Sequence, residues 1–166
     1  DLDEGVRMQA QARGIEVKIL LFADPGLLRG DAAANYWIAL RSKIPIQVLT
    51  ADVIAAELDS HLRGAEWIVD ALLGTGAQGN PQPPISTVIE RANAAPAQKF
   101  AVDLPSGINC DTGEPATPTI RAAVTGTFVA PKQGFNNPVA SPYLGSVEVL
   151  EIGVPGDLLR HYGLSR

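Results

Sequence analysis

The chain has 166 residues, 46% of them hydrophobic and 19% charged, which is typical of one compact domain with its own core. Its formal net charge of -5 and its scattered lysines and arginines argue against a nucleic-acid backbone or an anionic membrane surface as a partner. The single cysteine, Cys110, excludes an internal disulfide framework, and no apolar run reaches the roughly 20 residues that span a bilayer, so we expect a soluble, cytoplasmic protein.

The N-terminal part of the chain predicts a helix, a strand and a second helix. Residues 4–13 have a weak helical pattern that stops at Gly14, a residue typical of helix ends. Residues 17–22 are mostly apolar, which predicts a strand buried on both faces. Asp31 is a favourable N-cap and predicts a helix that runs to about Ser42.

Strands and helices continue to alternate up to residue 103. The pattern predicts strands at residues 46–49, 67–72 and 100–103, a helix capped by Thr50 or Asp52 that ends near Leu62, and a helix at residues 85–94. This alternation is typical of a three-layer α/β domain with a largely parallel sheet.

The alternation becomes looser after residue 104. Residues 105–113 are dense in turn-forming residues and predict a loop. Two more strands are expected at residues 124–130 and 147–152, and the apolar-polar alternation of the second predicts an edge strand with one wet face. A helical turn is expected at residues 158–162.

Two aspartates, Asp70 and Asp103, lie near the ends of predicted strands in similar contexts, V-D-A-L-L-G-T-G and V-D-L-P-S-G. Because ligands bind outside the carboxyl ends of strands in an open parallel sheet, we expect both carboxylates to face one crevice. A single strand-end aspartate more often satisfies local backbone N–H groups, but the repeated pattern favours a site. The turn at Ser106 adds a hydroxyl and carbonyls, which are oxygen ligands suited to a hard cation such as potassium.

Three glycines, Gly74, Gly76 and Gly79, closely follow Asp70. They would let backbone N–H groups approach a phosphate. The spacing is not a G-x-G-x-x-G pattern after the first strand, so from the glycines alone an ordinary strand-to-helix loop is an equally good interpretation.

The remaining reactive side chains give weaker indications. Lys132 follows a predicted strand and could reach a phosphate or a carboxamide, although most lysines are solvated surface residues. Cys110 has no histidine near it in the sequence, since the only two are His61 and His161. This scarcity argues against a Cys-His pair, a zinc site and a Ser-His-Asp triad.

Five segments carry a resemblance that extends over nearly the whole chain. They are G-D-A-A-A-N-Y (30–36), V-D-A-L-L-G-T-G (69–76), A-V-D-L-P-S-G-I-N-C-D-T-G (101–113), T-F-V-A-P-K-Q-G (127–134) and L-E-I-G-V-P (150–155). In order and spacing these segments resemble the YjeF N-terminal domain family, the NAD(P)HX epimerases, and the V-D-x-P-S-G-x-x-x-D-T-G block is the most specific of them.

The resemblance implies a Rossmann-like three-layer αβα sandwich with a mostly parallel sheet, usually a homodimer. It implies an isomerase that interconverts the S and R epimers of hydrated NADH and NADPH (NADHX and NADPHX), and a partner dehydratase that restores the coenzyme. Residue by residue, Asp70 and Ser106 match potassium ligands, Asp103 matches a substrate-binding aspartate, and Lys132 matches a lysine beside it. The substrate-phosphate loop matches Gly74, Thr75, Gly76, Ala77, Gln78, Gly79 and Asn80.

The sequence departs from the family at its N-terminus. The family has a G-N-N-G-G-D-G loop before the helix that here begins near Glu4, and nothing in residues 1–13 matches it. We therefore expect residues 1–166 to be a single domain of this type without its first strand and that asparagine-glycine loop. Either these residues are omitted from the sequence given, or the protein lacks them and is impaired. Omission is favoured, because a sheet without its central first strand would expose apolar surface.

Epimerisation requires inversion at C6 of the hydrated nicotinamide ring. We expect Asp103 to transfer the proton when the C6 hydroxyl leaves as water and returns to the other face, with Lys132 holding the carboxamide or tuning Asp103. The alternative is a non-catalytic nucleotide-binding or scaffold module that retains the pocket. An NAD-dependent oxidoreductase is disfavoured, because the glycines follow the wrong strand and the sequence has no evident catalytic Tyr-Lys or His pair.

Overall fold

The structure is a computed structural model that describes residues 14–49 and 54–164. The helix predicted at residues 4–13 and the caps predicted at Thr50 and Asp52 lie outside these ranges. The chain divides into two compact units, residues 1–54 and residues 55–166, and each is described by itself.

The first unit contains a two-stranded parallel sheet and one long helix. Strand β1 (Ile19–Leu21) pairs with β2 (Ile46–Val48), with Ile19 opposite Ile46. Between them lie the short 3-10 helix η1 (Pro25–Leu27) and helix α2 (Gly30–Arg41). The predicted N-cap at Asp31 is wrong: the cap position is Arg29, without a side-chain hydrogen bond, and Asp31 lies in the first turn of α2. Gly30, the first residue of α2, has a φ of 55°, a left-handed value that glycine adopts readily.

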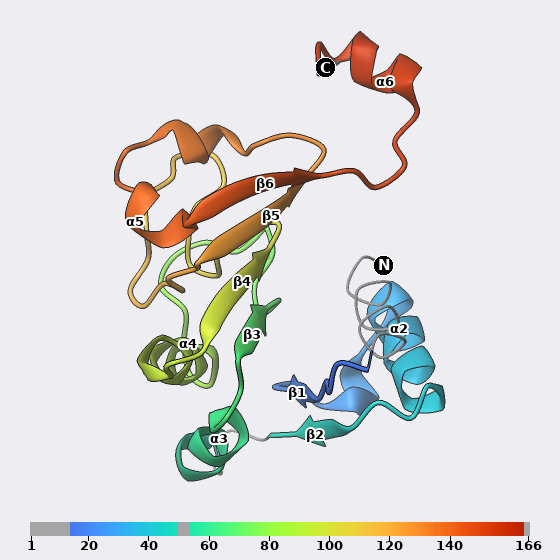
Figure 1. The fold of residues 1–166 in the computed structure, drawn as a ribbon, viewed down its shortest axis with the longest axis vertical. Coiled ribbons are helices and arrows are strands. Elements are labelled where there is room, and N and C mark those ends of the chain that lie inside the picture. The colour runs from blue at the N-terminus through green and yellow to red at the C-terminus, as the bar shows by residue number, and fades with distance from the viewer. Residues whose placement is uncertain (1–13, 50–53, 165–166) are drawn as a thin grey trace. The chain divides into compact units, whose positions relative to one another are not determined.

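The second unit contains a four-stranded sheet in which every pairing is parallel (Figure 1). The strands, in spatial order, are β3 (Trp67–Asp70), β4 (Gln98–Val102), β5 (Val124–Phe128) and β6 (Ser146–Leu150). The helical elements of this part of the chain are α3 (Ile54–Leu62), α4 (Ile85–Ala94), η2 (Gln133–Asn136), α5 (Ser141–Leu144) and α6 (Gly156–His161). The prediction that the last strand forms an edge is confirmed.

A small core fixes α4 to this sheet. Ile89 and Ala92 of α4 are buried against Ala101 of β4, together with Ile120 and Ile68. At about 25 cal/mol per Å² of apolar surface, each buried aliphatic side chain contributes roughly 1.5–3 kcal/mol. A second cluster around Leu104 and Leu144 lies beneath the loops that follow β4 and β5. The alternating elements and parallel sheets confirm the prediction of a Rossmann-like α/β fold.

Every described strand except β4 is shorter than predicted, and β1, expected at residues 17–22, covers only Ile19–Leu21. The strand expected at residues 67–72 ends at Asp70, because the Asp70 side chain accepts a hydrogen bond from the Leu72 N–H and turns the chain. The strand expected at residues 124–130 ends at Phe128. The sequence analysis did not predict η2 or α5, which are too short to show helical periodicity.

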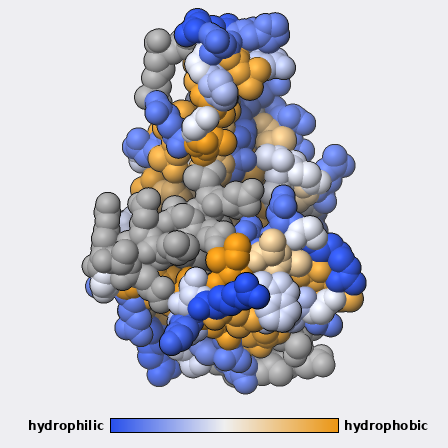
Figure 2. Space-filling view, turned by 90° about the vertical axis from the view of Figure 1, so that its right-hand side faces the viewer, coloured by the Kyte–Doolittle hydropathy of each residue, from blue (hydrophilic) through white to orange (hydrophobic). Residues whose placement is uncertain are grey.

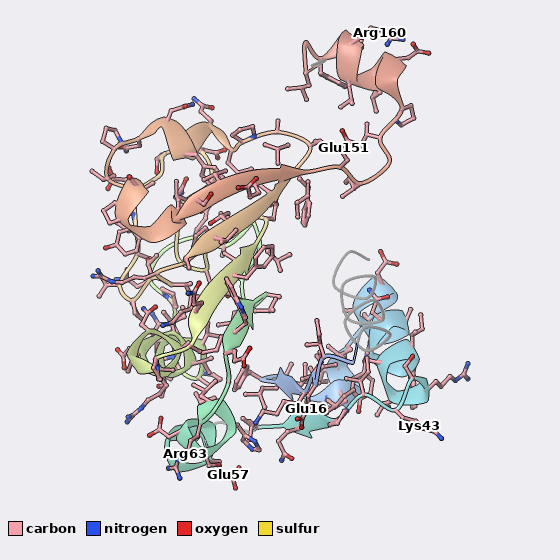
Figure 3. All side chains as sticks on the ribbon, in the orientation of Figure 1. Glu16, Lys43, Glu57, Arg63, Glu151 and Arg160 are labelled. Atoms are coloured by element: carbon pink, nitrogen blue, oxygen red, sulfur yellow. The ribbon has the colours of Figure 1, made fainter. Side chains whose placement is uncertain are left out.

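Figure 3 labels three exposed charged residues of this unit: Glu57 on α3, Arg63 just after α3 and Glu151 just after β6. None of the helices in the described residues is long and apolar enough to cross a membrane.

Candidate active site

The parallel sheet brings the carboxyl ends of β3, β4 and β5 to one edge. Asp70 is the last residue of β3 and pairs with Ala101 of β4, two residues before Asp103. Lys132 follows β5 on the next loop. The two aspartates and the lysine named from the sequence therefore come from three neighbouring strand ends, as expected.

Asp70 and Ser106 form a buried pair. The Ser106 hydroxyl donates to Asp70 Oδ1 at 2.7 Å, and the Ser106 backbone N–H donates to Asp70 Oδ2 at 2.7 Å. The Leu73 N–H donates in turn to Ser106 Oγ at 3.0 Å. Asp70 is only 2% exposed, and Ser106 is 1% exposed. These contacts connect the glycine loop after β3 to the turn after β4.

The Asp70 carboxylate has no cationic partner among the described residues. Burial raises its pKa above the ordinary value, and hydrogen bonds from Ser106 and Leu72 offset only part of that rise. A cation beside this carboxylate would favour its ionised form. Within the same described residues, no group of three His, Cys, Asp or Glu side chains could hold a metal ion.

Asp103 occupies a strained backbone position at the end of β4. Its φ is 70°, a conformation that residues other than glycine seldom adopt and that clusters at functional sites. Its Oδ1 atom accepts hydrogen bonds from the Phe128 N–H at 3.1 Å and from Thr127 Oγ1 at 3.2 Å. Lys132 Nζ lies 2.5 Å from the same oxygen. These contacts fix the carboxylate from one side.

The other oxygen of Asp103 is open. In the described part of the chain no group donates to Oδ2, and the side chain is 24% exposed. Lys132 is 19% exposed and also donates to the Phe128 carbonyl at 3.5 Å. Asp103 therefore presents one rigidly held carboxylate with a free oxygen, which is the arrangement that proton transfer to a bound molecule requires.

The glycine loop between β3 and α4 presents backbone donors. The N–H groups of Gly74, Gly76 and Gly79 donate to no acceptor among the described residues. A turn in which the Ala77 N–H donates to the Gly74 carbonyl at 3.1 Å shapes the loop. The Asn80 side chain accepts the Thr117 N–H at 2.9 Å and ties down its far end. Unpaired N–H groups on an exposed, anchored loop suit an anion.

The loop forms one wall of a pocket of about 230 Å³. The lining residues are Leu73, Gly74, Ala77, Gly79, Asn80, Leu104, Pro105, Gly107, Ile108, Asn109, Glu114, Pro115 and Ala116. Asn109 and residues 114–116 are lining residues that the sequence analysis missed. The sequence signal near them is the D-T-G turn at residues 111–113, which predicts only a loop.

Cys110 lies beside the pocket as a thiol. Its Sγ donates to Asp111 Oδ1 at 3.4 Å and to the Thr75 carbonyl at 3.6 Å. Burial raises the pKa of this thiol, and the hydrogen bond to Asp111 raises it further. The residue is therefore poorly suited to act as a nucleophile.

An open parallel sheet with polar side chains at the carboxyl ends of its strands is typical of α/β proteins of the Rossmann-like class. The model of the family described as "YjeF-related protein N-terminus" matches residues 7–134, and the chain belongs to this family.

Curated relatives share much of the sequence. The NAD(P)H-hydrate epimerase of Pirellula staleyi is 45% identical over 148 residues, which cover 89% of this chain and 65% of the relative. The NAD(P)H-hydrate epimerase of Rhodopirellula baltica is 43% identical over 154 residues, which cover 93% of this chain and 62% of the relative. The bifunctional NAD(P)H-hydrate repair enzyme Nnr of Moorella thermoacetica is 37% identical over 147 residues, which cover 89% of this chain and 28% of the relative. The chain thus spans less than two thirds of the length of each of these proteins.

A solved structure shows the same fold. The crystal structure of yeast ynu0 superposes with a TM-score of 0.70 at 19% identity, over 93% of this chain and 63% of the yeast chain.

Proposed function

We propose that the protein is an NAD(P)H-hydrate epimerase that interconverts the S and R forms of NADHX and NADPHX. Its relatives carry this name, and the chain belongs to their family. The observation that carries the proposal is Asp103, whose carboxylate is held at Oδ1 and open at Oδ2. It lies at the same sheet edge as an anchored loop of unpaired N–H groups.

The chemistry follows from the structure of the substrate, in which C6 carries a hydroxyl and is bonded to the ring nitrogen. The nitrogen lone pair forms a C=N bond as the C6–O bond breaks, and protonated Asp103 donates its proton to the departing hydroxyl, which leaves as water. Water then adds to the other face of the planar iminium, and the Asp103 carboxylate takes up its proton. Each cycle returns Asp103 to its starting state.

Lys132 and the glycine loop have supporting roles. The ammonium of Lys132, 2.5 Å from Oδ1, stabilises the carboxylate that forms when the proton has left. The loop from Gly74 to Asn80 would hold the diphosphate through its backbone N–H groups. Neutral peptide donors suit this task because backbone N–H groups can approach an anion closely and donate to it directly.

The direct test supplies purified protein with the R epimer of NADHX and follows formation of the S epimer by chromatography. We expect the equilibrium mixture of epimers to be reached far faster than without protein. Binding of the nucleotide without epimerisation would identify the alternative, a non-catalytic nucleotide-binding or scaffold module.

We also propose a potassium ion at Asp70 and Ser106. The two residues fit it because they place oxygen donors side by side, and the buried carboxylate lacks a cationic partner among the described residues. When bound, the ion would supply the positive charge that offsets Asp70 and would hold together the loops after β3 and β4.

Potassium chloride should raise the melting temperature of the protein by about 3 °C or more relative to choline chloride at equal ionic strength, because the ion binds only the folded state. Asp70→Asn should abolish this response in a thermal melt. Asp59→Asn, which removes an exposed carboxylate of α3, should keep it. An equal response in all three proteins would contradict the assignment of the ion to Asp70.

Assembly, location and partner are further parts of the proposal. We expect a homodimer in the cytoplasm. The apolar residues Trp37, Ile38 and Leu40, which are exposed on α2, support the dimer. Sedimentation analysis would test the oligomeric state. Figure 2 shows apolar side chains on the surface among hydrophilic ones. A dehydratase acting after the epimerase is expected, since relatives called bifunctional repair enzymes are more than three times as long as the segment they share with this chain.

A further inference from the structure

The hydroxyl of Thr127 contacts the reactive carboxylate from a buried position on β5. The residue is 0% exposed. Its Oγ1 atom lies 3.2 Å from Asp103 Oδ1 and 3.4 Å from the Ala130 carbonyl oxygen. A hydroxyl group has one proton to donate, so Thr127 can serve only one of these two acceptors at a time.

Three donors around Asp103 converge on the same oxygen. The Phe128 N–H, the Thr127 hydroxyl and the Lys132 ammonium lie 3.1, 3.2 and 2.5 Å from Oδ1. Hydrogen bonds and a cation at a carboxylate favour its ionised form. When Asp103 is protonated, its proton therefore resides on Oδ2, to which no group in the described part of the chain donates.

The two acceptors of Thr127 suit the two states of Asp103. While the carboxylate is ionised, Oδ1 is the stronger acceptor, because a charged acceptor makes the stronger hydrogen bond. Once Oδ2 carries a proton, this advantage is lost and the hydroxyl can turn to the Ala130 carbonyl. The buried proton of Thr127 thus has a partner in both states, which avoids the cost of an unpaired donor.

Lys132 needs no such alternation. It has three N–H groups, and its Nζ lies 2.5 Å from Asp103 Oδ1 and 3.5 Å from the Phe128 carbonyl oxygen. It can therefore contact both acceptors at once, and only Thr127 has to choose between them.

A strained turn supplies the second acceptor of Thr127. Val129 follows Phe128, the last residue of β5, and has a φ of 49°. A β-branched residue is an outlier in this left-handed region, and strained positions of this kind cluster at functional sites. The turn brings the Ala130 carbonyl back to within 3.4 Å of the Thr127 hydroxyl. The chain thus keeps an unfavourable backbone conformation beside the group that holds Asp103.

We infer that Thr127 is a positioning residue for epimerisation, whose hydroxyl donates to Asp103 Oδ1 while the carboxylate is ionised and to the Ala130 carbonyl while Oδ2 carries the proton. This inference rests on the proposed function. Oδ2 gives its proton to the departing hydroxyl, and the hydrogen bond from Thr127 stabilises the carboxylate that remains. When Oδ2 takes a proton from the incoming water, the hydroxyl turns back. Thr127 acts through Asp103, so its loss should slow the reaction without weakening substrate binding.

The experiment compares kcat and KM for NADHX in the wild type, Thr127→Val and Thr127→Ser. Valine keeps the branched shape but lacks the hydroxyl, and we expect it to lower kcat by roughly tenfold or more while KM changes by less than about twofold. Serine keeps the hydroxyl and should restore kcat to within about threefold of the wild type. If Thr127→Val does not fold in a thermal melt, Thr127→Ala, which also lacks the hydroxyl, carries the same expectation.

Thr125→Val is the matched control. Thr125 lies on the same strand, is also 0% exposed, and donates its hydroxyl proton to the Leu144 carbonyl at 2.6 Å. The control loses an equally buried hydroxyl that does not contact Asp103, so it should keep the wild-type kcat and KM. Equal kcat in Thr127→Val and Thr125→Val would overturn the inference. So would a Thr127→Ser protein as slow as Thr127→Val, or a loss that lies in KM alone.

A spectroscopic readout separates this inference from the proposed function, because it requires no catalysis. Infrared spectra of protein labelled with ¹³C-aspartate, minus those of labelled Asp103→Asn, isolate the carboxylate stretch of Asp103. We expect this band to move in Thr127→Val and to stay in place in Thr127→Ser and Thr125→Val. If the wild type does not epimerise but the band moves in this way, the proposed function fails and the hold of Thr127 on Asp103 stands. If epimerisation is observed and the band is the same in all four proteins, the inference fails and the proposed function holds.

Discussion

Asp103→Asn should lower the rate of epimerisation by roughly 10²- to 10⁴-fold, because an amide can neither give up nor take up the proton that the departing and returning hydroxyl requires. The substitution preserves the size of the side chain and an oxygen that can accept from the Phe128 N–H and Thr127 Oγ1. We therefore expect the fold and nucleotide binding to persist. The measurement is the initial rate of conversion of the R epimer of NADHX to the S epimer, with calorimetric binding of NAD⁺ as the companion readout.

Two further variants separate proton transfer from charge. Lys132→Met removes the ammonium beside Oδ1 but leaves the proton-transferring carboxyl, so its loss of rate should be smaller than that of Asp103→Asn. Asp59→Asn removes an exposed carboxylate on α3 and should keep the wild-type rate. Unchanged turnover in Asp103→Asn would exclude Asp103 as the acid-base group, even if the protein proves to be an epimerase.

The site geometry was predictable where it depends on the direction of the strands. Asp70 and Ser106 are separated by 36 positions in the sequence, yet their side chains lie 2.7 Å apart. The repeated V-D pattern sufficed to predict proximity, because parallel strands place their carboxyl ends at one edge. The constrained position of Asp103 was not predictable, since its φ of 70° and its contacts with the Phe128 N–H at the end of β5 and with Lys132 have no pattern in the sequence.

The predictions failed where short local patterns compete. Asp31 is a favourable cap by residue type, but α2 begins at Gly30 and Asp31 lies in its first turn, where a carboxylate is also favourable. Asn109 and residues 114–116 line the pocket. Their loop is shaped by an isolated bridge and by hydrogen bonds that Asn109 Oδ1 accepts from the N–H groups of Asp111 and Thr112, and neither feature has a periodic signature in the sequence. The place of these residues in the pocket wall is therefore evident only in the structure, although the neighbouring D-T-G turn belongs to the family resemblance.

That turn also yields the largest expected effect on stability, at Gly113. Its φ is 76°, and a Cβ there would overlap the carbonyl oxygen of Gly134 and lie 2.8 Å from Asn137 Cβ. A Cβ added at Gly134 would in turn overlap the backbone nitrogen of Gly113. The Gly134 N–H donates to the Cys110 carbonyl at 2.8 Å. The two glycines thus pack backbone against backbone, joining the pocket wall to the segment that follows Lys132.

Gly113→Ala should therefore lower the free energy of unfolding by about 3 kcal/mol or more, combining the cost of a left-handed alanine with that of overpacking. Gly64→Ala is the matched control: Gly64 has a φ of 78°, and no atom lies within 4 Å of its added Cβ. It should cost only about 1–2 kcal/mol. Urea unfolding of both variants measures the difference. Equal losses in the two variants would mean that the backbone around Gly134 adjusts to the added methyl group at no cost in stability. A larger loss for Gly113→Ala, together with a raised KM for NADHX, would connect the packing of this turn to the pocket that Glu114 lines.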